Sequence, residues 1–261
     1  MVGHALVLIS AGSIDVIYHE SCLDTLARFE DDSIDVVITS PPYNMRRRVS
    51  NGKLISRGND TPKNVAKYTE FTDDLPTEDY LEFHSKALTE CLRVSNRVFY
   101  NIAVVAGSKQ ALFQMIGKFA ESLKDIIIWD KGHGEPAVQE GVLNRQFEFI
   151  LIFEKDYPIS RMFRKDVYFK RGTLSDVWKI PREKHAKGHQ AVMPSKMVKT
   201  ILKNFSAEGD LVYDPFMGAG TTAVVCEQMN RRWIGSEISE QYVDLARQRV
   251  AEINGLNAFF D

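Results

Sequence analysis

Short apolar runs alternate with segments of helical period along most of the chain. The run 34–39 is rich in β-branched residues and suits a strand that is covered on both faces. The strands predicted in this way are 14–18, 34–39, 97–105, 125–129, 146–153, 211–213 and 232–235, with 5–9 as a further strand or an ordered lead-in. The predicted helices are 23–29, 77–94, 109–123, 194–205, 221–229 and 239–253. This alternation predicts an α/β fold with a largely parallel sheet and helices on both sides.

Two long segments interrupt the alternation. Residues 44–76 contain Gly, Asn, Asp and Pro without a sustained period, so they are predicted to form a long loop. Loops of that length in compact domains are usually functional or disordered. Residues 156–188 are basic, aromatic and broken by prolines and glycines, and they are predicted to form an insertion outside the core.

The positive charge of the chain is concentrated in these two segments. Residues 44–67 hold seven basic residues and one acid, and residues 155–189 hold ten basic residues and four acids. The rest of the chain has 16 basic and 30 acidic residues, although the net charge of the whole chain is only −2. Basic patches on an acidic body are typical of a protein that binds a polyanion. Solvated loops rich in Lys and Arg are the alternative interpretation.

The composition excludes several classes of protein. At 261 residues and 44% hydrophobic content, the chain is long enough to bury a sizeable core as one domain. It has no apolar run of the roughly 18 residues that span a bilayer, and no Lys or Arg precedes the short run 5–9, so neither a membrane protein nor a secretory signal is expected. The three cysteines are few and unpatterned, which favours a reducing, intracellular compartment and argues against a zinc cluster.

Residues 214–222, which we call the cofactor loop, follow a predicted strand and precede a predicted helix. Gly218 and Gly220 fit a loose nucleotide-binding pattern, and their lack of side chains would let a ligand approach the backbone. Glu237 lies 17 residues beyond Gly220, near the roughly 20 expected for an acid that binds ribose hydroxyls. Asp214 would repel a pyrophosphate and attract an ammonium group. The loop therefore favours a nucleoside-bearing cofactor with an ammonium group over a dinucleotide.

Residues 40–43, which we call the amine loop, follow the predicted strand 34–39. An exocyclic amine on a nucleobase is a poor nucleophile, because its lone pair is delocalised into the ring. The Ser40 hydroxyl and the Pro41 carbonyl are acceptors for its N–H groups, and the prolines fix the backbone. Tyr43 offers a face on which an extruded base can stack, worth about 1–3 kcal/mol. A polyproline turn is the alternative for this motif alone. Because ligands of open α/β sheets bind at the carboxyl ends of strands, we expect the two loops to form one site.

These motifs resemble those of the S-adenosylmethionine-dependent DNA amino-methyltransferases. Residues 35–44 are similar to the catalytic motif of that family and 210–226 to its cofactor motif, with Glu237 as the ribose acid. Residues 189–202 resemble the segment that helps to hold the methionine end of the cofactor. The catalytic motif comes first, which is the β arrangement of the family. One departure is Glu20-Ser21, where the family often has Gly-Asp.

The resemblance implies a class I methyltransferase fold: a Rossmann-like sheet, mostly parallel with one antiparallel strand, in a circularly permuted motif order. It implies S-adenosylmethionine as cofactor and a flipped base in double-stranded DNA as substrate, in the cytoplasm of a bacterial or archaeal cell. A monomer or homodimer and a companion restriction endonuclease belong to the same expectation. Ser40 in place of Asp resembles the N4-cytosine branch more than the N6-adenine branch. An N6-adenine enzyme, an RNA or protein methyltransferase and an inactive DNA-binding module are the alternatives.

The residues expected to act are carried over from these motifs. The catalytic residues are Ser40, Pro41, Pro42 and Tyr43. Cofactor contacts are expected from Asp214, Pro215, Phe216, Gly218, Gly220, Thr221, Thr222, Glu237 and Ser195. DNA contacts are expected from Arg46, Arg47, Arg48, Lys53, Arg57, Lys170 and Arg171, and no metal site is expected. The single domain would thus carry two DNA-recognition elements, the basic loop 44–76 and the insertion 156–188.

Overall fold

The computed structural model describes residues 14–44, 49–50, 53–54, 75–135, 140–156, 160–183 and 193–257. The strands are β1 (Val16–His19), β2 (Val36–Thr39), β3 (Val49–Ser50), β4 (Lys53–Leu54), β5 (Arg97–Ile102), β6 (Leu123–Glu135), β7 (Arg145–Glu154), β8 (Val177–Lys179), β9 (Leu211–Asp214) and β10 (Arg232–Glu237). The helices are α1 (Cys22–Leu26), α2 (Thr77–Val94), α3 (Lys109–Lys118), α4 (Ser195–Phe205), α5 (Thr221–Gln228) and α6 (Glu240–Asn257). None of these described helices combines the length and the hydropathy that a membrane span requires.

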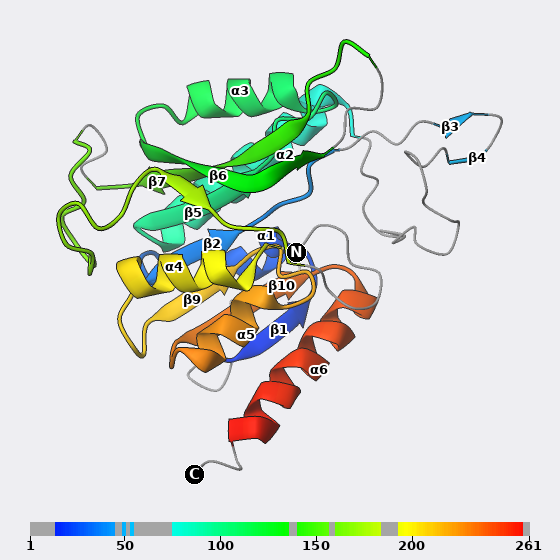
Figure 1. Ribbon diagram of the computed structural model, residues 1–261. Helices are drawn as coiled ribbons and strands as arrows, with labels where there is room; N and C mark the ends of the chain where they lie inside the picture. Colours follow the sequence, from blue (N-terminus) through cyan, green and yellow to red (C-terminus); the bar gives the residue numbers. More distant parts are fainter. Residues whose placement is uncertain are drawn as a thin grey trace, which may run out of the picture.

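Eight of the described strands form one sheet in the order β1, β10, β9, β2, β5, β7, β6, β8 (Figure 1). Strand β7 runs antiparallel to both of its neighbours, and the other neighbouring pairs are parallel. The prediction of a mostly parallel sheet with one antiparallel strand is therefore confirmed. Strands β9 and β2 are neighbours inside the sheet. The strand that follows β9 in the chain, β10, lies on one side of this pair, and β5, the next strand of the sheet after β2 in the chain, lies on the other side. This reversal makes the carboxyl ends of β9 and β2 the position where such folds bind ligands.

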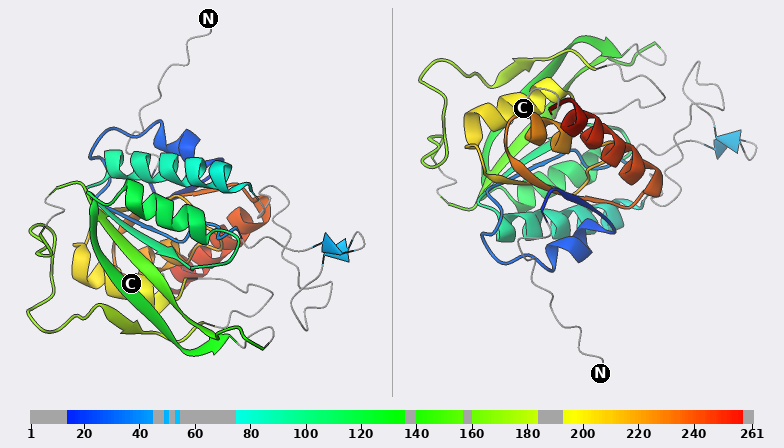
Figure 2. Two further views of the ribbon diagram at one scale, coloured as in Figure 1. Left: turned by 90° about the horizontal axis from the view of Figure 1, so that it is seen from above. Right: turned by 90° about the horizontal axis from the view of Figure 1, so that it is seen from below.

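The helices cover both faces of the sheet (Figure 2). Helices α4, α5 and α6 pack on one face in a cluster that includes Val36 and Ile38, and α1, α2 and α3 pack on the other face with Val37. Successive side chains of a strand point to opposite faces, so the apolar run of β2 supplies both clusters. Helix α4 shows the complementary pattern, because its buried side chains Met197, Val198, Ile201, Leu202 and Phe205 recur at helical spacing.

The structure corrects three details of the sequence prediction. Helix α3 ends at Lys118, and strand β6 begins at Leu123, so the end of the predicted helix 109–123 is wrong. The predicted loop 44–76 contains a short antiparallel pair, β3 and β4. The segment 156–188 does not lie wholly outside the core, because β8 pairs with β6 and buries Trp178 to 5% exposure. The predicted run 5–9 lies outside the described residues.

Candidate active site

The amine loop and the cofactor loop meet at the carboxyl ends of β2 and β9. Thr39, the last residue of β2, donates a hydrogen bond through Oγ1 to Oδ1 of Asp214, the last residue of β9, at 2.9 Å. Both residues are buried, with exposed fractions of 0% and 3%. The prediction that two loops distant in the sequence come together is therefore confirmed.

Both carboxylate oxygens of Asp214 accept hydrogen bonds from the residues around the two loops. Oδ1 also accepts from the backbone N–H of Phe216 at 3.0 Å, and Oδ2 accepts from Oγ1 of Thr222 at 2.6 Å. Burial raises the pKa of Asp214 from 3.8 to about 6, and the hydrogen bonds from Thr222, Thr39 and Phe216 oppose the shift. The carboxylate is thus a structural link between the loops, and its attraction for an ammonium group stays a prediction.

The raised pKa of Asp214 makes the stability of the protein depend on pH. The folded state holds this proton more tightly than the unfolded chain, so the contribution is complete below pH 4 and is lost as pH rises through about 6. The difference between the pKa values of 3.8 and about 6 corresponds to about 3 kcal/mol. We expect the difference in unfolding free energy between the wild type and Asp214→Asn to change by about this amount between pH 4 and 7. Urea denaturation across that range measures it, and a constant difference would contradict the shift.

The cofactor loop has groups that fit a nucleoside-bearing ligand. Glu237, at the end of β10, accepts through Oε2 from the backbone N–H of Gly218 at 2.8 Å and through Oε1 from Ser239 at 2.9 Å. A Cβ added to Gly218 would find open space, with only the Phe216 carbonyl oxygen 3.9 Å away. The Thr221 hydroxyl is buried and has no hydrogen-bond partner among the described residues. An acid, an open backbone and an unpaired hydroxyl thus lie together where α5 begins.

Gly220 has a packing role that differs from the sequence expectation. It adopts φ +80°, and a Cβ added to it would lie 2.6 Å from Cβ of Ala246 on α6. Its missing side chain therefore allows α6 to approach the loop, as well as providing the left-handed conformation before α5. Close approach to a ligand is the role that the geometry leaves to Gly218.

We expect Gly220→Ala to lower the free energy of unfolding by about 2–4 kcal/mol, because the strain of alanine at a positive φ and its steric overlap with Ala246 both destabilise the folded state. The matched control is Gly218→Ala, which has φ +52° but open space around the new Cβ. That variant is expected to lose only about 1 kcal/mol. Urea denaturation of the two variants measures the difference, and equal losses would contradict the packing role.

The backbone carbonyls of the amine loop differ in their hydrogen bonding. The Pro42 carbonyl accepts from the Tyr80 hydroxyl of α2 at 2.8 Å, and the Tyr43 carbonyl accepts from the Ser108 hydroxyl at 2.8 Å. The Pro41 carbonyl has no donor within the part of the chain that the structure describes. Asn44, at φ +55°, closes the loop by exchanging two hydrogen bonds with the backbone of Leu75. The predicted acceptor Pro41 thus lies in a loop whose neighbouring residues are held by hydrogen bonds.

A polar network that the sequence analysis missed surrounds the Tyr43 hydroxyl. This hydroxyl lies 2.8 Å from Oε2 of Glu148, 3.2 Å from Nδ2 of Asn101 and 3.1 Å from Oγ of Ser40. Lys131 pairs with the other oxygen of Glu148 at 2.6 Å. Burial, first, and the charge of Glu148 raise the pKa of Tyr43 well above its usual value. Single polar residues inside apolar strand runs were the signal available in the sequence, because such residues are rarely buried without a partner.

An aromatic cluster on α2 links the two loops on one face of the sheet. The Tyr80 ring, whose hydroxyl binds Pro42, lies 4.0 Å from the His84 ring. His84 in turn faces Phe216 of the cofactor loop at 6.3 Å with an interplanar angle of 25°. Burial lowers the pKa of His84 to about 3, so the ring is neutral. Phe216 is partly buried in this cluster, and its contact with a cofactor stays a prediction.

Ser195 lies at the start of α4 and donates to Oε2 of Glu183 at 2.9 Å. Burial lowers the pKa of Arg249, and the negative charge of Glu183 opposes part of that decrease. Arg249 donates to the Ala219 carbonyl of the cofactor loop. Ser195 is therefore connected to the cofactor loop through two charged side chains.

The predicted DNA-binding residues fall in two different places. Arg46, Arg47, Arg48 and Arg57 lie outside the described residues, and of Lys53 only the backbone of β4 is described. Lys170 and Arg171 follow Phe169, whose ring packs 5.4 Å from Phe205 at the carboxyl end of α4. The main chain of this segment is also held by Asn204. The carboxyl end of α4 lies near the amino ends of the parallel strands, whereas the two loops follow their carboxyl ends (Figure 1). The structure therefore does not bring Lys170 and Arg171 to the site.

Glu20 and Ser21, the departure from the family pattern, have local roles. The Ser21 hydroxyl accepts from the Leu23 N–H at 3.3 Å and caps α1. The Glu20 carboxylate pairs with Arg28 and accepts from Thr25. Both side chains therefore make their contacts within the segment around α1.

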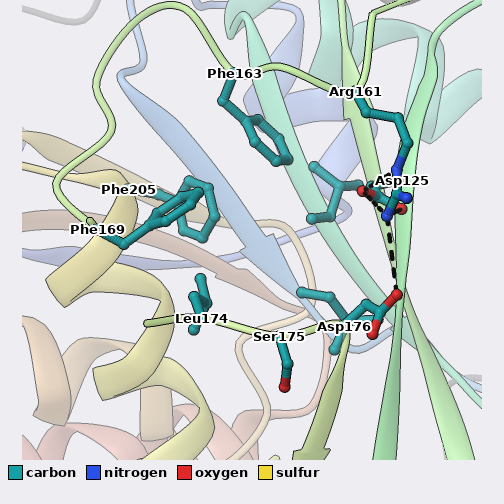
Figure 3. Close-up of a pocket in the computed structure, with 10 residues that line it drawn as sticks. Asp125, Arg161, Phe163, Phe169, Leu174, Ser175, Asp176 and Phe205 are labelled. Carbon is teal, nitrogen blue, oxygen red and sulfur yellow. Dashed lines mark hydrogen bonds and ion pairs between the residues drawn. The ribbon is translucent and has the colours of Figure 1, made fainter. Parts of the chain in front are cut away.

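A cavity of about 390 Å³ lies on the α4 face of the sheet (Figure 3). The rings of Phe163, Phe169 and Phe205 form one wall, and the ion pair of Arg161 with Asp125 borders the other side. Among the described residues, none from the amine loop or the cofactor loop lines it. This cavity is therefore separate from the candidate active site.

Comparisons with known proteins agree with this geometry. A family model described as DNA methylase, N6_N4_Mtase, matches residues 34–248. The type II methyltransferase M.BglII of Bacillus subtilis is 27% identical over 280 residues, an alignment that spans 90% of this chain and 68% of that protein.

Solved structures show the same fold. The PvuII DNA methyltransferase, described as cytosine-N4-specific, aligns with a TM-score of 0.65 and 17% identity, covering 92% of this chain and 89% of the other. TTHA0409 of Thermus thermophilus, in complex with S-adenosyl-L-methionine, aligns with a TM-score of 0.62 and 22% identity, covering 91% and 93%. The chain thus has the fold of class I S-adenosylmethionine-dependent methyltransferases.

Proposed function

Because the chain belongs to the N6/N4 DNA methylase family, we propose that it methylates the exocyclic N4 amine of a cytosine flipped out of duplex DNA. S-adenosylmethionine is the methyl donor. The observation that carries the proposal is the hydrogen bond between Thr39 and Asp214, which fixes the amine loop beside the cofactor loop. Ser40 in place of Asp, a resemblance to the N4-cytosine branch, supports cytosine as the target.

The amine loop activates the substrate nitrogen without a covalent intermediate. The Ser40 hydroxyl and the Pro41 carbonyl, for which the described residues supply no donor, accept the two amine hydrogens, which favours a pyramidal nitrogen with a localised lone pair. The partly buried Tyr43 ring is anchored through its hydroxyl and gives the extruded base a stacking face. Stacking and these hydrogen bonds offset the few kcal/mol that base extrusion costs.

The cofactor loop holds the donor. S-adenosylmethionine supplies an electrophilic methyl group when it is bound. Glu237 would bind the ribose hydroxyls and the open backbone at Gly218 would contact the ligand, while the Thr221 hydroxyl, which has no partner among the described residues, would offer a further polar contact. The negative charge of Asp214 would favour the ammonium group of the donor, and Phe216 would be a packing surface for its adenine or thioether chain.

The direct test is methyl transfer by the purified full chain. Unmethylated duplex DNA is incubated with S-adenosylmethionine, and its nucleosides are analysed by mass spectrometry. N4-methylcytosine is expected. N6-methyladenine in its place would show that the target is the N6 amine of adenine. Transfer to RNA or protein with none to DNA would overturn the proposal, as would the absence of cofactor binding by calorimetry. Methylation-aware sequencing of DNA from cells that express the chain gives the sequence context.

We expect Arg46, Arg47 and Arg48 to contact DNA phosphates, because they directly follow the amine loop in the sequence. Each lost phosphate contact reduces the salt dependence of log K by about 0.9. Replacing the three by alanine should therefore reduce the slope of log K against log salt by about 2–3. The matched control is Lys170→Ala/Arg171→Ala, at the opposite edge of the sheet, which should leave the slope unchanged. Fluorescence anisotropy at several salt concentrations measures both, and an unchanged slope in the triple variant would contradict the assignment.

A further inference from the structure

A buried charge network lies directly behind the amine loop. Glu148 is 7% exposed and Lys131 is 4% exposed, and their ion pair joins β7 to β6. Asn101 on β5 is 1% exposed and donates through Nδ2 to Glu148 at 2.8 Å. The only amine-loop side chain that this network touches among the described residues is the Tyr43 ring, through its hydroxyl. Such a costly set of groups behind one hydroxyl calls for a reason beyond stability, because a buried ion pair is seldom worth more than apolar packing.

Donor and acceptor rules fix the direction of every hydrogen bond in the network. An ionised carboxylate only accepts, so the single Tyr43 proton goes to Glu148. The Tyr43 oxygen is then left with lone pairs, which accept from Asn101 and from Ser40. Ser40 therefore donates its only proton to Tyr43. Its own lone pairs are left for a donor on the open side of the loop.

We propose that Glu148, held by Lys131 and Asn101, is a positioning residue that makes Ser40 a hydrogen-bond acceptor for the substrate amine. This inference rests on the proposed function, because it assigns the amine hydrogens to Ser40. Glu148 acts through the Tyr43 hydroxyl and touches no reacting atom. Its role is to keep the Ser40 proton directed away from the substrate.

Glutamine at position 148 should reverse the direction of the network. Lys131 can only donate, so the amide oxygen of the glutamine would face Lys131 and its NH₂ group would face Tyr43. Tyr43 would then accept from the glutamine and donate its proton to Ser40. A lone pair of Ser40 would be occupied by that proton, and the acceptor for the amine would be weakened, without any change in side-chain size.

A double-mutant cycle tests the path through Tyr43. We expect Glu148→Gln to lower kcat for methyl transfer by about 10- to 100-fold. The KM for DNA and the affinity for S-adenosylmethionine should change by less than about twofold, because the network touches neither ligand directly. Tyr43→Phe retains the ring but removes the hydroxyl, so adding Glu148→Gln to it should have little further effect. A full additional loss in the double variant would overturn the proposal, and so would a wild-type kcat in Glu148→Gln.

Glu154→Gln is the matched control for the loss of a buried ion pair. Glu154 is on the same strand, β7, is 2% exposed and pairs with Arg97 and Lys124. It is the last residue of β7, six residues beyond Glu148, and no hydrogen bond or ion pair joins it to the described residues of the amine loop, so its variant should lower stability while kcat stays at the wild-type value. An equal loss of kcat in both variants would assign the effect to stability and overturn the proposal.

A signal that needs neither DNA nor cofactor separates this proposal from the proposed function. In Glu148→Gln the Asn101 amide must turn its oxygen toward the new NH₂ group. Its side-chain ¹⁵N–¹H resonances, identified by their loss in Asn101→Asp, should therefore shift, whereas Glu154→Gln should leave them in place. An unchanged Asn101 signal in Glu148→Gln would overturn the network even in a protein that fails to methylate DNA. A shifted signal with no methyl transfer to any acceptor would count against the proposed function and against the catalytic role of the network.

Discussion

Alanine in place of Asp214 is expected to abolish methyl transfer and to lower the free energy of unfolding by about 3–5 kcal/mol. The carboxylate accepts three hydrogen bonds, from Thr39, Phe216 and Thr222, and all three donors would lose their partner in a buried environment. Each unsatisfied donor costs about 1–3 kcal/mol, partly offset by water or rearrangement. The hydrogen bond from Thr39 is also the direct link between the two loops, so the geometry of the site would be lost with it. Urea denaturation and tritium transfer to duplex DNA measure the two effects.

Two milder variants keep the Asp214 prediction testable if the alanine variant does not fold. Asp214→Asn keeps an acceptor for Thr39 and Phe216 and removes the charge, so it should fold but bind S-adenosylmethionine more weakly. Thr222→Val removes one donor to Asp214 and leaves the hydrogen bond from Thr39 intact, so it should lower the free energy of unfolding by only about 1 kcal/mol. Full activity in Asp214→Ala would show that the loops meet without this carboxylate.

The sequence was sufficient for the elements whose pattern is local. Strands β2 and β9 are apolar runs closed by Pro-containing loops, so both the strands and the loops that follow them could be predicted. The single antiparallel strand was an inference from family resemblance. Strand β8 was missed because it has three residues and only Trp178 is buried, which is too short for a periodic pattern.

Asn101 and Glu148 stand out in the sequence as polar residues within apolar strands, but the partners that they meet behind Tyr43 could not be predicted, because the network depends on contacts between strands. Asn101, Lys131 and Glu148 lie on β5, β6 and β7, and they meet only through the pairing of those strands. The register that brings Glu148 opposite Trp129 is a property of the folded sheet and leaves no local signature. The position of the basic segment relative to the two loops could not be predicted for a related reason. Lys170 and Arg171 belong to a basic segment, but that segment packs at the end of α4 far from the loops.

Removal of the Ser40 hydroxyl should affect the chemical step more than any other change of one atom in the amine loop. We expect Ser40→Ala to lower kcat by about 10²–10³-fold, comparable to the loss of one preorganised hydrogen-bonding group in other active sites. The hydroxyl is expected to bind the amine more strongly as the nitrogen becomes pyramidal and gains positive charge. An interaction that strengthens in the transition state appears in kcat, whereas an equal interaction in both states appears in KM.

The measurement that separates these cases for Ser40 combines single-turnover methylation with fluorescence of 2-aminopurine at the target base. Ser40→Ala should still extrude the base and bind S-adenosylmethionine, because Tyr43 and the cofactor loop are unchanged. Ser33→Ala, which removes an exposed hydroxyl bound to the Glu30 carbonyl, is the control for a general effect of the substitution. A Ser40→Ala rate within about threefold of the wild type would leave the Pro41 carbonyl as the only acceptor that the reaction requires, since a threefold change is less than one net hydrogen bond.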